Sequence, residues 1–131
     1  MTNEEKQLLL IDLCARSPFG VKCNAFLKQI DGSFKSVFGT FKGYNGWATV
    51  GNNLVDIETV KPYLRPMSSM TEEEEKEFWK VVDNYGSDSN AFDGFELGDV
   101  VDWLNKHHFD FRGLIKKGLA LEATEGMYKT E

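Results

Sequence analysis

The chain has 131 residues, of which 41% are hydrophobic and 27% are charged, with ten phenylalanines and three tryptophans. This length suits one domain with one core, and the composition is typical of a folded protein and excludes a disordered chain. The net charge of −6 argues against a nucleic-acid partner, because duplex nucleic acid is bound mainly by neutralising its phosphates.

The charge is unevenly distributed along the chain. Residues 1–66 carry eight Lys/Arg and six Asp/Glu, a balance of +2, whereas residues 67–131 carry seven Lys/Arg and fifteen Asp/Glu, a balance of −8. The acidic second half favours another protein, basic or neutral, as the partner. It also leaves open an acidic mimic of nucleic acid that inhibits a host DNA-binding protein.

The N-terminus "MTNEEKQLLLIDL" lacks the features of a secretory signal, since it has acidic residues where a basic region is needed and a short apolar run. No apolar run approaches the roughly 20 residues that span a bilayer. We therefore expect a cytoplasmic protein without membrane contact, in which Cys14 and Cys23 are reduced thiols.

Residues 4–16 predict the first helix. Asn3 is a candidate N-cap, two glutamates follow in the first turn, and Leu9 with Leu13, or Leu10 with Cys14, line one side at helical spacing. The segment "SPFG" ends the helix, because Pro18 disfavours helical geometry in the residue before it.

The next segment predicts strands. The turn signals Asp31-Gly32, Asn45-Gly46 and "GNN" at 51–53 separate strands near residues 21–30, 33–43, 47–50 and 54–58. We expect a small four-stranded antiparallel meander that curls into a barrel-like sheet, of which an SH3-like barrel is one form. A bulge at Gly39 would bring Phe38 and Phe41 to the same, buried face.

The second half predicts helices. Two prolines, at 62 and 66, fit a rigid connector, and Thr71 with Glu74 has the form of a capping box that starts a helix ending near Gly86. The four glutamates at 72–75 fit a solvated cap better than an acidic partner site.

Beyond a loop at 86–94, which fails as a calcium loop because Asp93 stands where glycine is required, a second helix spans "FELGDVVDWLNKHH". A short third helix would run over "FRGLIKKG" between Asp110 as N-cap and Gly118. The predicted class is therefore α+β in a single domain, 1–131. Residues 1–66 form the first helix and the meander, 67–123 contain two to three helices, and 124–131 form a flexible tail.

The stretch "WLNKHHFDFRGLIKKG" at 103–118 has the residue types of an active site, yet its spacing favours a helix–turn–helix of the core. His107 and His108 are adjacent, so on a helix they diverge by about 100° and cannot share a metal. We expect no metal and no cofactor. Arg112, Lys116 and Lys117 are candidates for anion binding, although the two lysines equally complement the negative end of a helix.

Three segments of the chain resemble a known group of proteins. They are "LCARSPFGVKC", "VKPYLRPMSSMTEEE" and "DWLNKHHFDFRGLIKKGLALEA", and they are similar to segments of small uncharacterised proteins that recur in Bacteroides genomes and in the phages and mobile elements of those bacteria. The resemblance covers both ends and the middle connector. It implies a place in that group but no activity, cofactor or binding residue.

Three functional hypotheses follow from these observations. The first is a non-enzymatic binding or accessory protein of a phage or mobile element that acts through protein–protein contacts, with Tyr44, Trp47 and Arg65 as candidate contacts because aromatic and arginine side chains dominate interfaces. The second is the acidic nucleic-acid mimic. The third is a small enzyme that uses a histidine, which would need His107 or His108 in a pocket beside another polar group.

Overall fold

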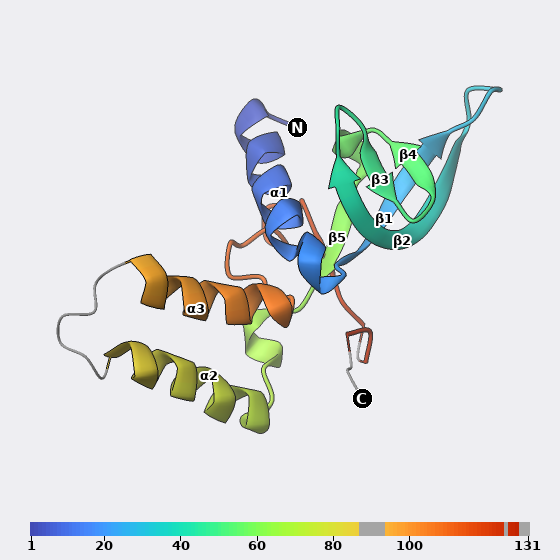
Figure 1. The fold of residues 1–131 in the computed structure, drawn as a ribbon. Helices are drawn as coiled ribbons and strands as arrows, with labels where there is room; N and C mark the ends of the chain where they lie inside the picture. The colour runs from blue at the N-terminus through green and yellow to red at the C-terminus, as the bar shows by residue number, and fades with distance from the viewer. Residues whose placement is uncertain (87–93, 125, 129–131) are drawn as a thin grey trace.

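The computed structural model describes the backbone of residues 1–86, 94–124 and 126–128, and it describes side chains in these ranges except at 83–98. Within these residues an N-terminal helix is followed by a mostly antiparallel sheet of six strands and then by a pair of helices (Figure 1). The α+β class and the order of helix, antiparallel strands and helices are thus confirmed. Most of the predicted loop at 86–94, including the rejected calcium site, lies outside the described residues.

Helix α1, Asn3–Arg16, begins one residue earlier than predicted, and its N-cap is Thr2 instead of Asn3. The Thr2 hydroxyl accepts a hydrogen bond from the Glu5 amide at 3.1 Å, and the Glu5 carboxylate accepts one from the Thr2 amide at 2.9 Å. This reciprocal capping box satisfies two amides that the first turn of a helix leaves without partners. The single-turn 3-10 helix η1, Ser17–Phe19, ends α1 as the "SPFG" segment predicts.

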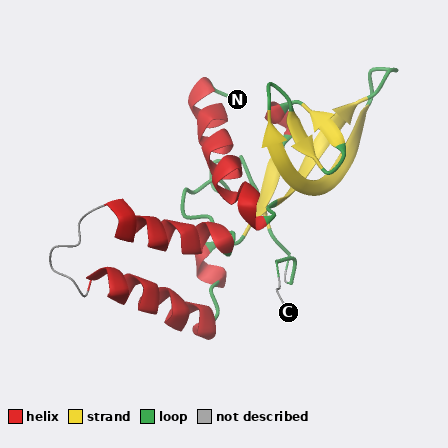
Figure 2. Cartoon of the chain, viewed as in Figure 1, coloured by secondary structure: helices red, strands yellow, loops and turns green. Residues whose placement is uncertain are grey.

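Four strands form the predicted meander: β1 Lys22–Lys28, β2 Phe34–Tyr44, β3 Ala48–Val50 and β4 Asn53–Val55. They pair antiparallel in sequence order, with turns at the three predicted positions. The chain then makes the single-turn 3-10 helix η2, Ile57–Thr59, and returns as β5, Lys61–Leu64, antiparallel to β1. Figure 2 shows the resulting sheet strongly curled.

The prediction of four strands is wrong by two. The supposed rigid connector contains β5, and the short strand β6, Leu121–Glu122, pairs parallel to it, so the sheet order is β4-β3-β2-β1-β5-β6. Proline within a run normally argues against a strand. Here Pro62 lies opposite Cys23 in a short two-pair ladder, and it is buried.

The predicted bulge at Gly39 is also wrong. The pairing of β1 with β2 runs without a break from Phe34 to Thr40, and the irregularity falls later, between Phe41 and Gly43. Because alternation continues through Gly39, Phe38 lies on the outer face and is 56% exposed, whereas Phe41 is buried. Gly39 serves close packing instead, since a Cβ there would lie 2.8 Å from the backbone nitrogen of Gly51.

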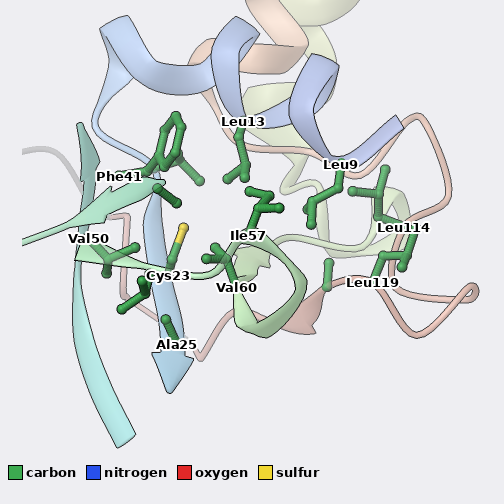
Figure 3. Packing of buried hydrophobic residues seen from close by; sticks show 14 of the residues in the cluster. Leu9, Leu13, Cys23, Ala25, Phe41, Val50, Ile57, Val60, Leu114 and Leu119 are labelled. Carbon is green, nitrogen blue, oxygen red and sulfur yellow. The ribbon is translucent and has the colours of Figure 1, made fainter. Parts of the chain in front are cut away.

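The main core lies between α1 and the inner face of the curled sheet. Figure 3 shows Leu9 and Leu13 above the inward-facing side chains of the sheet, with Leu114 and Leu119 of the C-terminal segment completing one side. Both α1 leucines are fully buried, and burial of each stabilises the fold by about 1.5–3 kcal/mol before entropy is counted. Of the two apolar pairs predicted for this helix, Leu9 with Leu13 is therefore confirmed, whereas Cys14 of the other pair is exposed.

The second helical part is a hairpin of α2, Glu72–Gly86, and α3, Gly94–Lys106, preceded by the single-turn 3-10 helix η3, Met67–Ser69. The predicted capping box is confirmed: the Thr71 amide donates to Glu74 at 3.0 Å, and the Glu74 amide donates to the Thr71 hydroxyl at 3.2 Å. A second buried cluster, Trp103, Leu104 and Phe109, joins the hairpin to the rest of the chain.

The predicted third helix over 111–118 is absent, and the segment is a series of turns. The helix fails because Gly113, inside this segment, has a positive φ of 76°, which lies outside the helical region. The Asp110 carboxylate still acts locally, accepting hydrogen bonds from the amides of Leu114 and Ile115 at 2.8 and 3.0 Å. It stabilises a turn and not a helix N-terminus.

The C-terminal segment, predicted to be flexible from residue 124, contacts the rest of the fold through Tyr128. The Tyr128 hydroxyl donates to the Tyr63 carbonyl at 2.6 Å and accepts from the Lys22 amide at 2.9 Å, and the ring packs on His108 with centroids 4.0 Å apart. These contacts connect the end of the chain to β1 and β5. Residues 125 and 129–131 lie outside the description.

Candidate functional site

A cluster of polar side chains lies where α1, α3 and the turns at 107–118 meet, and we call Asp12, Arg16, Asn105 and Arg112 the polar junction. Asp12 and Arg16 are completely buried, one turn apart on α1. Both carboxylate oxygens of Asp12 accept from Arg16 Nε at 3.0 Å, and Arg112 Nη1 donates to Asp12 at 2.6 Å and to Asn105 at 3.2 Å. Arg16 also donates to the Phe109 carbonyl.

The polar junction explains where Arg112, Lys116 and Lys117 lie. Arg112 pairs with Asp12 and stacks on the Phe111 ring, 4.2 Å from its centroid, so its guanidinium is bound by groups of the same chain. Lys116 and Lys117 are exposed on the turns. The three candidate anion-binding side chains are therefore divided between the interior and the surface, and the two lysines do not lie at a helix end.

The two histidines lie in different environments. His108 is 3% exposed and its Nε2 lies 3.0 Å from the Phe19 carbonyl. Burial, with the Arg16 cation as a second cause, lowers the pKa of His108 to about 4, so this ring is neutral at pH 7. Two buried nitrogens, Nδ1 of His108 and Nη1 of Arg16, have no hydrogen-bond partner among the described residues.

His107 lies against the helical hairpin. Its ring packs on Trp103 with centroids 4.3 Å apart, and its nitrogens lie 3.8 Å from Glu74 and from Glu77. Partial burial lowers the pKa of His107. In the described chain, no hydrogen bond links either histidine to Cys14, which is exposed, or to Cys23, which is buried. The residues of a nucleophile–base pair are thus not brought together.

Arg65, a predicted partner contact, is bound within the chain. Its guanidinium makes two hydrogen bonds of 2.6 Å to the Glu74 carboxylate and lies over the Phe109 ring, 4.2 Å from the centroid. The Arg65 hydrogen bonds lower the pKa of Glu74 to about 2. Glu74, one of the four glutamates expected to be solvated, is therefore the exception, because it fixes α2 to the end of β5.

The other two predicted contacts lie at the surface. Trp47 is 56% exposed and Tyr44 is 36% exposed. Trp47 directly precedes β3, and Leu54 of the paired strand β4 is 61% exposed on the outer face, because its pairing partner Thr49 alternates with the buried Ala48 and Val50. We call Trp47 and Leu54 the tryptophan corner.

A second exposed group was missed by the sequence reasoning, which placed Phe38 on the buried face. Phe26 of β1, with Phe34 and Phe38 of β2, lies on the outer face of the hairpin, and the ring of Tyr63 of β5 lies 5.7 Å from that of Phe38. We call these four residues the phenylalanine face. The signal was available: strict alternation through "FKSVFGTF" places Phe34 and Phe38 on the face opposite Phe41.

Comparisons with protein-family models, with curated proteins and with solved structures found no match for this chain. Within the residues described, no helix is both long enough and apolar enough to span a bilayer. In the same residues, no group of three or more His, Cys, Asp or Glu side chains is arranged to hold a metal ion. The exposed aromatic surfaces are thus the features from which a function can be argued.

Proposed function

We propose that this chain is a non-enzymatic binding protein that captures another protein through the tryptophan corner. Trp47 and Leu54 carry the proposal, since these two large apolar side chains, one directly before β3 and one on the paired strand β4, are each more than half exposed. Exposed apolar groups of this kind mark interaction sites, and tryptophan is among the residues that contribute most to binding energy. Tyr44 pairs with the buried Ala48 and so belongs to the opposite face of the sheet from Leu54, which leaves it outside the tryptophan corner.

We further propose that residues 21–64 form an SH3-like barrel. The support is topological: a meander of antiparallel strands, a single 3-10 turn after β4, and a fifth strand that returns antiparallel to β1. Folds of this kind carry many unrelated functions, so the barrel provides a rigid platform and does not identify the partner. An accessory role in a Bacteroides phage or mobile element rests on the sequence resemblance alone.

The experiment is an affinity capture from Bacteroides lysate treated with nuclease, comparing the wild type with Trp47→Ala. Trp79→Ala is the matched control, because Trp79 is 53% exposed on α2, away from the sheet. We expect one protein to be retained at constant stoichiometry by the wild type and by Trp79→Ala, and to be weakened at least tenfold by Trp47→Ala, a loss of about 1.4 kcal/mol. Equal retention by Trp47→Ala, or no retained protein, would exclude the tryptophan corner as the contact surface.

The acidic mimic is a second candidate, favoured by one observation. Among the side chains that the structure describes on α2 and α3, six carboxylates are exposed: Glu72, Glu73, Glu75, Glu77, Asp99 and Asp102. Such a surface competes with DNA for basic grooves through charge. If it acts in this way, the chain displaces DNA from a basic host protein at low salt, and glutamine at positions 73 and 75 weakens the displacement without changing capture at the tryptophan corner.

A further inference from the structure

The phenylalanine face has a chemistry different from that of the tryptophan corner. Phe26, Phe34 and Phe38 are 44, 60 and 56% exposed. Phe26 pairs with Ser36, so Phe34 and Phe38 are its two diagonal neighbours on the facing strand. The register therefore places three aromatic side chains on one outer surface, and the contact between the rings of Phe38 and Tyr63 extends this surface onto β5.

The charged side chains at the outer positions of these strands are all lysines. Lys22 and Lys28 of β1 and Lys61 of β5 alternate with the aromatic and polar residues, and no carboxylate occupies an outer position of β1, β2 or β5. Within the described chain, no ion pair involves Lys28 or Lys61. The face therefore presents aromatic rings within a frame of positive charge.

From these observations we propose that the phenylalanine face binds a single-stranded polynucleotide, with bases stacked on the phenylalanine rings and phosphates near the lysines. Proteins that bind single strands combine aromatic platforms with basic surroundings in this way. Lysine is depleted in protein–protein interfaces, which favours a nucleic acid over a protein on this face. The proposal is independent of protein capture by the tryptophan corner.

The ring spacing favours a single strand over a duplex. Diagonal neighbours on paired strands are about 7–8 Å apart, roughly twice the 3.4 Å rise between stacked bases in one strand of a duplex. Bases that follow these rings must therefore be separated from one another. An unpaired, extended strand meets this condition, and its bases have both ring surfaces available for stacking.

The net charge of −6, which argued against nucleic acid from the sequence, is segregated in space. Residues 21–66 carry six Lys/Arg and three Asp/Glu. The acidic helices α2 and α3 lie at the opposite end of the molecule from the β1–β2 hairpin, as Figure 1 shows. Salt screens the interaction between exposed charges over about 8 Å at physiological ionic strength, so charges at opposite ends of the molecule act on each other weakly.

Residues 21–66 contain three carboxylates, and Glu122 of β6 is a fourth in the sheet, on the far side of β5 from β1. Asp31 in the hairpin turn accepts hydrogen bonds from the amide and hydroxyl of Ser33, and Asp56 accepts one from the Glu58 amide at 3.0 Å. Glu58 is exposed in η2, next to Thr59, which hydrogen-bonds the backbone of Phe26. Glu58 thus lies at one border of the face, and the bound strand should follow the Lys28 side of the hairpin.

The test measures fluorescence anisotropy of labelled oligothymidylate and oligouridylate on the full chain at low salt. We expect saturable binding that weakens about tenfold in each of Phe26→Ser and Phe38→Ser. The logarithm of the binding constant should fall with the logarithm of salt concentration with a slope of about −2 for three phosphate contacts. Lys28→Gln should reduce that slope by about 0.7, whereas Lys80→Gln on α2 should leave it unchanged.

Each outcome decides the proposal. Binding of either oligonucleotide with loss in the phenylalanine variants supports it, and the thymidine and uridine arms tell which sugar is preferred. Equal binding by Phe26→Ser and Phe38→Ser, no saturable binding, or equal affinity for polyglutamate of matched charge overturns it. Trp47→Ala separates the two surfaces, because it should lose the captured protein while retaining the oligonucleotide.

Discussion

Replacing Asp12 by asparagine is the most direct test of the polar junction. The substitution keeps the size of the side chain but removes the only carboxylate that pairs with Arg16 and Arg112 in the structure as described. Because both side chains of the Asp12–Arg16 pair are 0% exposed, the variant leaves a buried guanidinium without its counter-charge. Breaking a buried pair in this way costs about 3–5 kcal/mol.

That cost is large beside the total stability of a domain, which is about 5–15 kcal/mol. Urea unfolding at pH 7, followed by circular dichroism, should show it as a lower free energy of unfolding with an unchanged dependence on urea. Glu4→Gln is the control, because Glu4 is exposed on the same helix and its loss should cost under about 1 kcal/mol. If Asp12→Asn loses less than about 1 kcal/mol, the assignment of the polar junction as a buried ionic cluster is wrong.

Three further predictions concern backbone packing, pH and the C-terminal segment. Gly39→Ala should lower the free energy of unfolding by about 1–3 kcal/mol through overpacking, since its Cβ would lie 2.8 Å from the backbone of the β3–β4 turn. Ser36→Ala, on the outer face of the same strand, is the control and should leave the free energy of unfolding in urea nearly unchanged. The His108 pKa of about 4 in the folded chain lies below the ordinary 6.5, so the unfolded chain binds more protons between these two pH values. The free energy of unfolding should therefore fall as pH drops from about 6.5 to about 4. In His108→Asn, whose asparagine tolerates the positive φ of this position, this dependence on pH should be absent. Tyr128→Phe leaves the Tyr63 carbonyl without the hydroxyl bound at 2.6 Å and should cost about 1–3 kcal/mol in thermal unfolding.

The features that the sequence predicted correctly are those set by neighbours along the chain. The Thr71 capping box, the Asp31-Gly32 and Asn45-Gly46 turns, and the apolar positions of α1 each depend on a few consecutive residues. Their hydrogen bonds and positive φ angles are local requirements that particular residue types meet. Local chemistry therefore sufficed for most of the elements in the first 82 residues.

The errors arose where distant segments decide the conformation. Strand β6 exists because residues 121–122 reach β5, and the Arg65–Phe109 bridge aligns the segment after α3 in the same direction. No local signal marks either contact, and two prolines obscured β5. Phe38 of β2 was misassigned because burial was inferred from residue type, although the alternation of the strand already placed it on the face opposite Phe41.

The stretch 103–118, whose composition suggested an active site, has a structural role that follows from its contacts. His108 lies against the Phe19 carbonyl, and His107 lies beside Glu74 and Glu77. Arg112 donates to Asp12, and Asp110 accepts hydrogen bonds from amides of the following turn.

These polar contacts lie between two separate hydrophobic clusters, one under the sheet and one in the helical hairpin. Apolar surfaces alone tolerate sliding, whereas the paired hydrogen bonds between Arg16 and Asp12 and the bond from Arg16 to the Phe109 carbonyl require one arrangement. The polar junction therefore fixes the acidic helices at a distance from the lysine-framed phenylalanine face. That separation is the condition under which a chain with a net charge of −6 can present a surface suited to an anionic ligand.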